Sequence, residues 1–457
     1  MERNIKTEKL IDDEVGGDDG ENVKKNDNKT VMIVFFSLII DLLAFTMILP
    51  LMPALMDYYK ETDKQGLYSW LMGSVKGIQE ILKAPDKFSS VLFGGFLGSM
   101  FSFMQFLSMP IVGALSDVYG RKRMMIICLT GISLSYLLWA VSNNFLIFVL
   151  ARFVGGISKG NVSLAMAIIT DVTTPKTRGK SMALVGIAFS IGFILGPIVG
   201  VTFTRINSGS GYWYFYPALF AFLLSIVDLV YFIYSFEETL SVKRRAKSLA
   251  RGISGAFIYI NPLDLFQFNG VTGLTPHELN NLRTLGYSHF LYLFTYSGLE
   301  FTITFLTHHK FGFSSMQQGY MFFVMGIIMA VIQGSYVRRI PADKTQFYSK
   351  FGLWLVIPGF VIIGIASSIV TLYVGIILFS VSTSMAVTCM MTMVSKIGPE
   401  NQKGTITGIF RSLGALARSC GPIIASLAFW SIGSTPTYLI GSFVLILPPL
   451  IVNKVAL

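Results

Sequence analysis

Charged residues are scarce in this chain: Asp, Glu, Lys and Arg make up 13% of its 457 residues, against about 25% in an average soluble domain. Hydrophobic residues make up 53%, and mean hydropathy is +0.63. This composition excludes an ordinary soluble domain. A helix needs about 20 apolar residues to cross a bilayer, and twelve such stretches are centred near residues 44, 103, 132, 158, 192, 225, 298, 328, 359, 382, 416 and 444. We therefore predict an all-α membrane protein with twelve transmembrane helices.

Cysteine and catalytic motifs are scarce as well. The three cysteines, Cys128, Cys389 and Cys420, all fall within apolar stretches, so no disulfide is expected. The run 179–181 ends like a phosphate-binding loop, but Thr174 stands where that loop needs glycine. His308 and His309 have no third metal ligand in view. We expect no enzyme activity, no cofactor and no metal, so any transport must draw on a gradient.

The net charge of +11 follows membrane topology. Of 36 Lys and Arg residues, six lie in residues 1–30, nineteen lie in turns that we place on the same side, and seven lie on the other. Because cytoplasmic turns are enriched in Lys and Arg, we place both termini in the cytoplasm. The expected partner of this basic surface is anionic membrane lipid rather than nucleic acid. We expect the protein to be a monomer. We favour the plasma membrane as its location, with an organelle membrane as the alternative.

The chain divides into two related halves. Residues 1–30 form a polar tail that we predict to be disordered, and a second polar stretch covers 237–286. Six apolar stretches precede this linker, in 31–236, and six follow it, in 287–457. A shared pattern of small residues and proline recurs at a shift of 225 residues, and such repeats are typical of transporters. We assign the repeated residues Gly196, Pro197, Gly421 and Pro422 to helix packing, together with Gly192.

Seven ionisable residues lie inside the predicted spans: Asp41, Arg152, Lys159, Asp228, Glu300, Arg411 and Arg418. Each costs about 2.5–3.5 kcal/mol at a helix centre, so each is expected to face a partner or a wet cavity. Arg152 and Lys159 are seven positions apart, as are Arg411 and Arg418. This spacing places the two members of each pair on one face of a helix. The four bases outnumber the three acids, which favours an anionic substrate.

We predict that Lys159 and Arg418 contact the substrate directly, with Arg411 and Arg152 as further binding residues, because ammonium and guanidinium groups bind carboxylate or sulfate. In the alternative, every base has a structural partner. The two acids Asp41 and Glu300 are predicted to couple transport to protons, because a buried carboxylate can hold a proton near neutral pH. The alternative is that these acids permanently neutralise Lys159 and Arg152.

The turn between the second and third stretches carries a motif, GALSDVYGRKRMM at 113–125. It resembles the G-x-L-x-D-x-x-G-R-K signature of the major facilitator superfamily, and residues 152–156, 171–179 and 236–240 resemble further elements of that family. The resemblance covers residues 31–457 and implies two pseudo-symmetric six-helix bundles. It also implies a cytoplasmic gate formed by Asp117, Gly120, Arg121 and Asp171, a charge lock that holds the two halves together when the inner face is shut. The central path is implied to be lined by helices 1, 4, 7 and 10.

The segments 41–53, 156–164 and 412–422 look most similar to the animal tetracycline-transporter-like branch of the superfamily, which is proposed to carry organic anions. The motif around Gly196 resembles one associated with antiporters. The resemblance implies a secondary active transporter of small amphipathic organic anions that works by alternating access, coupled to protons or to a counter-anion. Two alternatives remain, a proton-coupled exporter of cationic or zwitterionic drugs and a membrane receptor or scaffold that has lost transport.

Overall fold

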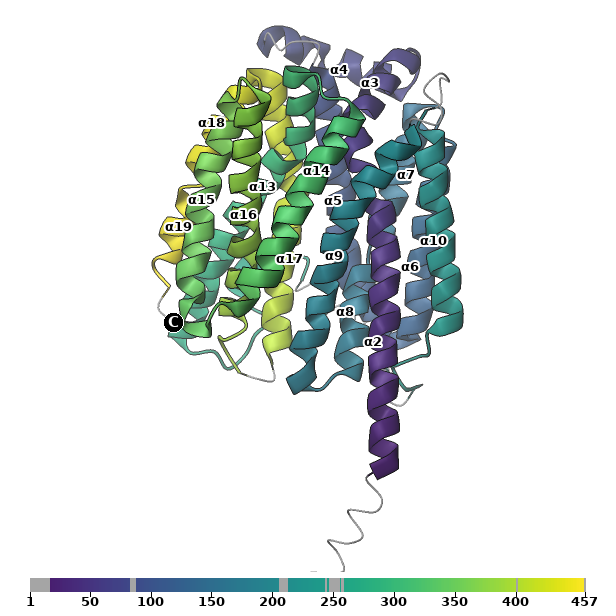
Figure 1. Cartoon of the computed structure of the whole chain (residues 1–457), viewed down its shortest axis with the longest axis vertical. Coiled ribbons are helices and arrows are strands. Elements are labelled where there is room, and N and C mark those ends of the chain that lie inside the picture. Colours follow the sequence, from purple (N-terminus) through teal and green to yellow (C-terminus); the bar gives the residue numbers. More distant parts are fainter. Residues whose placement is uncertain are drawn as a thin grey trace, which may run out of the picture.

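Long helices that run side by side build the molecule (Figure 1). The computed structural model describes residues 17–82, 88–204, 213–242, 245, 255, 259–399 and 402–455. The helices of the N-terminal half are α2 (Gly17–Thr46), α3 (Met52–Thr62), α4 (Leu67–Leu82), α5 (Ser89–Tyr119), α6 (Arg121–Ala140), α7 (Phe145–Ser158), α8 (Asn161–Val172), α9 (Pro175–Thr204) and α10 (Phe215–Ser235). A short 3-10 turn, Leu49–Leu51, joins α2 to α3.

The helices of the C-terminal half are α12 (Pro262–Gln267), α13 (Pro276–Phe311), α14 (Ser315–Val331), α15 (Thr345–Ile365), α16 (Ile369–Val394), α17 (Lys403–Ile432), α18 (Ser434–Val444) and α19 (Leu447–Val452). A π-helical turn, Ile332–Tyr336, extends α14. The α13 helix begins with a capping box, in which the side chains of Thr275 and Glu278 each accept a hydrogen bond from the backbone N–H of the other residue. The hydrogen bonds from Thr275 hold the pKa of the Glu278 carboxyl below its ordinary value.

The twelve predicted spans all appear as helices. Within the described residues, eleven helical segments are long and apolar enough to cross a membrane. Helix 1 comprises α2 and α3, helix 4 comprises α7 and α8, and helix 12 comprises α18 and α19. The one predicted span that is not among these eleven is helix 7, which corresponds to α13. Its polar side chains include Tyr292, Tyr296 and Glu300. Tyr292 and Tyr296 are buried inside the protein, so this span can be less apolar than the lipid-facing helices.

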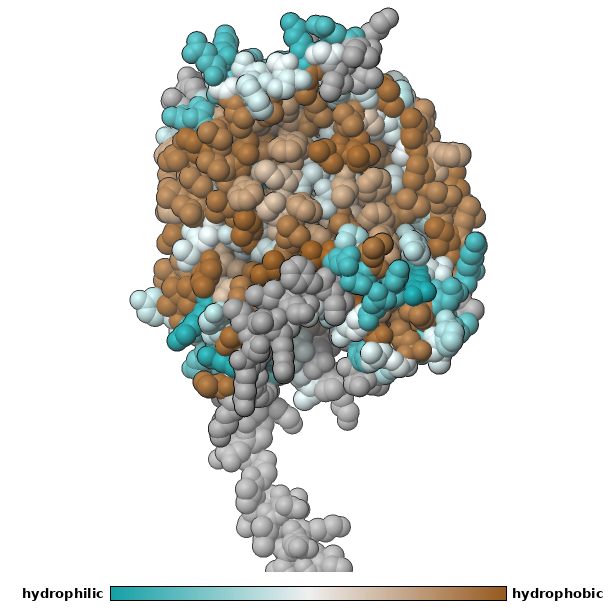
Figure 2. Space-filling model, turned by 180° about the vertical axis from the view of Figure 1, so that it is seen from behind, coloured by the Kyte–Doolittle hydropathy of each residue, from teal (hydrophilic) through white to brown (hydrophobic). Residues whose placement is uncertain are grey.

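On the face drawn in Figure 2, an apolar belt crosses the middle of the molecule, with polar side chains toward both ends. The α2 helix projects from one end, which we call the tail face, and α3 and α4 lie at the opposite end, the far face (Figure 1). In the structure α2 begins at Gly17, within the range predicted as a disordered tail, whereas residues 1–16 lie outside the described part of the chain. The α4 helix lies between the first and second predicted spans and is not one of the twelve.

The repeated glycines, Gly196 and Gly421, lie at matching helix contacts in the two halves, and Gly192 adds to the contact of α9. In α9, Gly192 and Gly196 lie so close to α2 that a Cβ atom at either position would clash with it. The Thr46 hydroxyl of α2 donates a hydrogen bond of 2.6 Å to the Gly192 carbonyl oxygen. In α17, Gly421 lies equally close to α13. Helix 5 therefore packs on helix 1 in the same way as helix 11 packs on helix 7.

The repeated prolines lie where the two halves meet. The Pro197 carbonyl oxygen of α9 faces Gly319 of α14, and the Pro422 carbonyl oxygen of α17 faces Gly95 of α5. A hydrogen bond of 2.9 Å from the Ile423 N–H to the Ser99 hydroxyl oxygen joins α17 to α5. The most extensive contacts between the halves are therefore two related helix pairs, in which small residues permit close approach.

Candidate functional site

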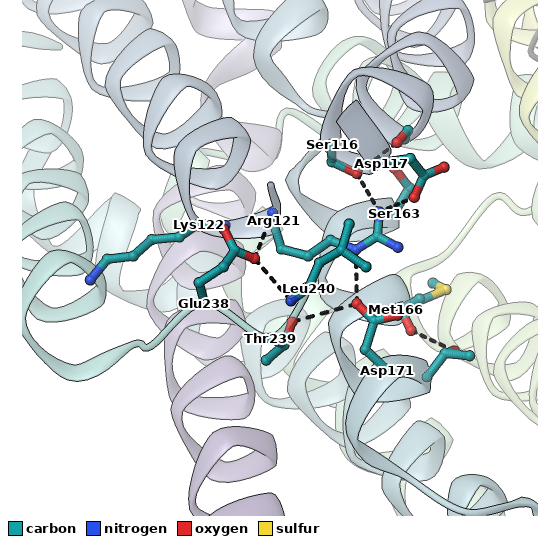
Figure 3. Close-up of polar contacts among 12 residues, drawn as sticks. Ser116, Asp117, Arg121, Lys122, Ser163, Met166, Asp171, Glu238, Thr239 and Leu240 are labelled. Carbon is teal, nitrogen blue, oxygen red and sulfur yellow. Dashed lines mark hydrogen bonds and ion pairs between the residues drawn. The ribbon is translucent and has the colours of Figure 1, made fainter. Parts of the chain in front are cut away.

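A polar cluster at the tail face joins the ends of three helices (Figure 3). The Arg121 guanidinium forms ion pairs with Asp117 at 2.6 Å and with Asp171 at 2.9 Å, and it donates a hydrogen bond of 2.5 Å to the Ser116 hydroxyl. Gly120, between α5 and α6, has φ of +101°, a conformation that favours glycine. The structure thus brings together the four predicted gate residues.

Glu238, from the segment after α10, completes this cluster (Figure 3). Its two carboxylate oxygens accept hydrogen bonds from the backbone N–H groups of Arg121 and Lys122, at 2.9 and 3.2 Å. These N–H groups lie at the start of α6, so the carboxylate caps the helix and faces the positive end of its dipole. A Cβ at Gly120 would clash with Glu238. The sequence identified Glu238 only as part of a segment that resembles the family.

The residues that bind Arg121 in the described structure belong to the N-terminal half, apart from Glu238 at the start of the linker, and none belongs to the C-terminal half. The cluster therefore braces one half in this conformation, whereas the resemblance implied a lock that holds the two halves together. One contact nearby does join the halves, because the Arg411 guanidinium of α17 touches the Met166 sulfur of α8.

A buried ion pair lies where helix 4 is interrupted. The α7 helix ends at Ser158 and α8 begins at Asn161. Lys159, between them, places its Nζ atom 2.6 and 2.7 Å from the two carboxylate oxygens of Asp41 in α2. The Asn161 side-chain amide donates a second hydrogen bond of 2.8 Å to the same carboxylate, and sequence reasoning did not identify this residue. Asp41 and Lys159 are 2% and 3% exposed, so Lys159 is not a surplus cation here.

Arg152 lies beside this pair, in a small cavity within the N-terminal half. Its guanidinium carbon is 4.2 Å from the centre of the Phe101 ring, a cation–π contact, and its Nε atom has no hydrogen-bond partner among the residues that the structure describes. The cavity is lined by Phe45, Phe101, Ile132, Ser135, Tyr136, Arg152, Gly155 and Lys159. Its lining confirms that Arg152 and Lys159 share one side of helix 4, as their spacing predicted.

Asp228 adds a second carboxylate to the N-terminal half. It is 1% exposed in α10, and one of its carboxylate oxygens has no hydrogen-bond partner within the described part of the chain. It interacts with Ser37 of α2 and lies within electrostatic range of Asp41 and Lys159. The two bases of this half, Arg152 and Lys159, are therefore matched in number by two acids.

The C-terminal half distributes its charges differently. Glu300 of α13 accepts a hydrogen bond of 2.9 Å from the Tyr296 hydroxyl and lies within electrostatic range of Arg418. Arg411 and Arg418 of α17 are both exposed. Neither forms an ion pair with a carboxylate in the described residues. This half therefore presents two bases against one acid.

Residues 34–422 of the chain match the Major Facilitator Superfamily. The chain is 41% identical over 436 residues to the human Major facilitator superfamily domain-containing protein 10, with 94% of each protein covered. It is 23% identical to the class B tetracycline resistance protein of Escherichia coli, with 73% of this chain and 78% of that protein covered.

Solved structures agree with this relationship. The crystal structure of the human organic anion transporter MFSD10 (TETRAN) is 40% identical in sequence and superposes with a TM-score of 0.77, over 93% of this chain and 99% of that chain. The D-xylose-proton symporter shares only the fold, at 14% identity and a TM-score of 0.68, over 94% of this chain and 98% of that chain. The sequence match and the common helical architecture show that this protein belongs to the major facilitator superfamily.

Proposed function

We propose that this protein is a secondary active transporter that carries small amphipathic organic anions by alternating access. The similarity to the human organic anion transporter supports this substrate class. The two exposed arginines of α17, which lack a carboxylate partner among the described residues, carry the proposal. An anion that enters between the halves can bind Arg418 or Arg411 without first breaking an ion pair, so we propose these two residues as its main contacts.

Lys159 enters the proposal by a second step, because Asp41 occupies it in this conformation. A proton that binds Asp41 would remove the negative charge and leave the Lys159 ammonium available to a substrate anion. Asp41 is thus proposed as a proton-coupling residue, and Glu300, which holds no ion pair in the described structure, as a second. Coupling to a counter-anion is the alternative, in which the exchanged anion occupies the same bases. We propose that Arg152 supports Lys159 electrostatically.

Uptake of an anionic fluorescent probe by reconstituted protein tests the proposal. Neutralising Arg418 to Gln is expected to lower the initial rate at least tenfold, with the protein still folded by size-exclusion chromatography. Arg123→Gln is the matched control. It removes the same charge from an exposed arginine at the start of α6. Equal uptake by the wild type and the Arg418 variant would end the proposal.

A second candidate is a proton-coupled exporter of cationic or zwitterionic drugs. It is favoured by the similarity to tetracycline resistance proteins and by Glu300, whose carboxylate forms no ion pair within the described residues. In that case Glu300 and Asp41 are the counter-ions of the substrate. Replacement of Glu300 by Gln would then abolish transport of a cationic dye while Arg418→Gln leaves it unchanged.

We also propose that the cluster around Arg121 is a cytoplasmic gate, which places both termini in the cytoplasm. The bracing of α5, α6 and α8 by one guanidinium supports this role, because the N-terminal half must move as a unit when the halves rock. We propose that the protein acts as a monomer in the plasma membrane, with anionic lipid at its basic tail face.

A further inference from the structure

Two ionisable side chains join the halves at the far face. Asp57 lies on α3 in the N-terminal half, and His308 lies in the last turn of α13 in the C-terminal half. The His308 Nε2 atom is 2.9 Å from an Asp57 carboxylate oxygen, and the two side chains are 28% and 38% exposed. The pair is therefore accessible to water. It also crosses the boundary along which the halves must separate to open the far face.

The second ring nitrogen of His308 faces another acceptor. Its Nδ1 atom is 3.2 Å from the backbone carbonyl oxygen of Phe313. The turn after α13 fixes this carbonyl, because Gly312 has φ of +64° and the Phe313 N–H donates to the Thr307 carbonyl oxygen at 3.1 Å. A carbonyl and a carboxylate only accept hydrogen bonds, whereas a neutral imidazole has a single N–H. His308 therefore makes both contacts at once only when it is protonated.

Several polar groups surround the pair. The closest are Ser90 of α5, which lies in hydrogen-bonding range of Asp57, and His309, whose ring centre is 5.2 Å from that of His308. The other charged or titratable groups nearby are Lys60 and Glu61 on the next turn of α3, Tyr68 of α4 within electrostatic range of Asp57, and Lys310 of α13, which donates to the Gly364 carbonyl oxygen. Of these groups only the histidines change charge between pH 5 and 8 at their ordinary pKa values.

We propose that Asp57 and His308 form a proton-dependent latch that holds the far face closed while His308 is protonated. When α3 and α13 separate, His308 loses the carboxylate that favours its second proton, and that proton passes to water. The closed far face thus holds one proton that the open far face releases. By linkage, acid in the far-face compartment favours closure, and a rise in pH favours opening, by up to about tenfold in the open-to-closed ratio per pH unit. This inference depends on alternating access and not on the substrate.

Distances between spin labels on the two halves measure this equilibrium without any substrate. Labels at Lys64→Cys and Val370→Cys, two exposed far-face positions, report the separation of the halves in full-length protein in lipid nanodiscs. Cys420 is replaced by Ser, because it is the one native cysteine that is not buried. The open population of the otherwise unchanged protein is expected to rise steeply as pH increases from 5.5 to 8.5.

Variants of the pair test whether the latch causes this response. His308→Gln and Asp57→Asn should each flatten the pH dependence, and His308→Arg, which stays charged, should keep the far face closed throughout the pH range. His309→Gln, a matched change at the adjacent histidine, should leave the slope intact. A slope in His308→Gln or His308→Arg equal to that of the parent protein would overturn the proposal. If His308→Gln does not fold, His308→Arg alone decides it.

Discussion

Replacement of Asp41 by Asn tests the buried ion pair of helices 1 and 4. The change is nearly isosteric, and the new amide oxygen can still accept the hydrogen bond from Asn161, which now measures 2.8 Å. The main loss is the negative charge opposite Lys159, whose side chain is 3% exposed. Removal of one partner from a buried ion pair costs about 3–5 kcal/mol, because the other charge is left unpaired in low dielectric. We expect Asp41→Asn to lower the free energy of unfolding by that amount.

A double-mutant cycle measures the pair itself. Lys159→Gln removes the unpaired charge, so the Asp41→Asn/Lys159→Gln protein should recover most of the stability lost in Asp41→Asn alone. Unfolding by SDS in mixed micelles supplies the free energies, and Arg123→Gln at an exposed site should change them by no more than about 0.5 kcal/mol. A loss below about 1 kcal/mol for Asp41→Asn, as found for exposed pairs, would refute the reasoning.

Three further changes test the gate and the helix contacts by thermal unfolding. Gly120→Ala should lower the free energy of unfolding by about 1–3 kcal/mol, since φ of +101° strains alanine and its Cβ would clash with Glu238. A loss below about 0.5 kcal/mol, the usual range for surface substitutions, would contradict this. Glu238→Ala should cost about 1 kcal/mol through the lost cap of α6, and an unchanged midpoint would count against that cap. Gly421→Ala should cost about 1–3 kcal/mol, because the added Cβ would force α17 away from α13. Gly186→Ala is the control and should be neutral or stabilising, because a Cβ there has no neighbour within 4 Å. Equal effects of the two changes would contradict the packing argument.

The spans could be predicted from the sequence because their determinants are local, whereas the tail-face cluster was implied by the resemblance of its motif to a known family. A run of about 20 apolar residues is sufficient to indicate a membrane helix. Asp117, Gly120 and Arg121 lie within five positions of one another, so a short turn leaves few ways to arrange them. Glu238 comes from another part of the chain, and only its similarity to the family drew attention to it.

Partners that are distant in sequence could not be predicted in the same way. Asp41 and Lys159 are 118 positions apart, and the pattern of apolar residues does not fix the rotation of each helix. Helix 4 is interrupted beside Lys159, at Gly160. Glycine alone does not predict such a break, because it is common within membrane helices. The sequence shows four bases and three acids inside the spans, but it does not show which bases are unpaired. In the structure Lys159 is paired with Asp41, and the two arginines of α17 are exposed.

His308 shows the same limit at the far face. The sequence shows two adjacent histidines without a third metal ligand, and it gives no sign that either has a carboxylate partner. Its carboxylate partner, Asp57, is 251 positions away on a helix that continues beyond the predicted first span. Counting donors and acceptors around a side chain requires coordinates, because it depends on the turn that brings the Phe313 carbonyl back to the ring.

The most direct test of the account compares two probes that share one aromatic core, one carrying a carboxylate and the other an ammonium group. Their initial rates of uptake into proteoliposomes are measured over a range of pH in the wild type. The account predicts saturable, pH-dependent uptake of the carboxylate probe, with the ammonium probe taken up no faster than by protein-free vesicles. Saturable transport of the ammonium probe alone would contradict it.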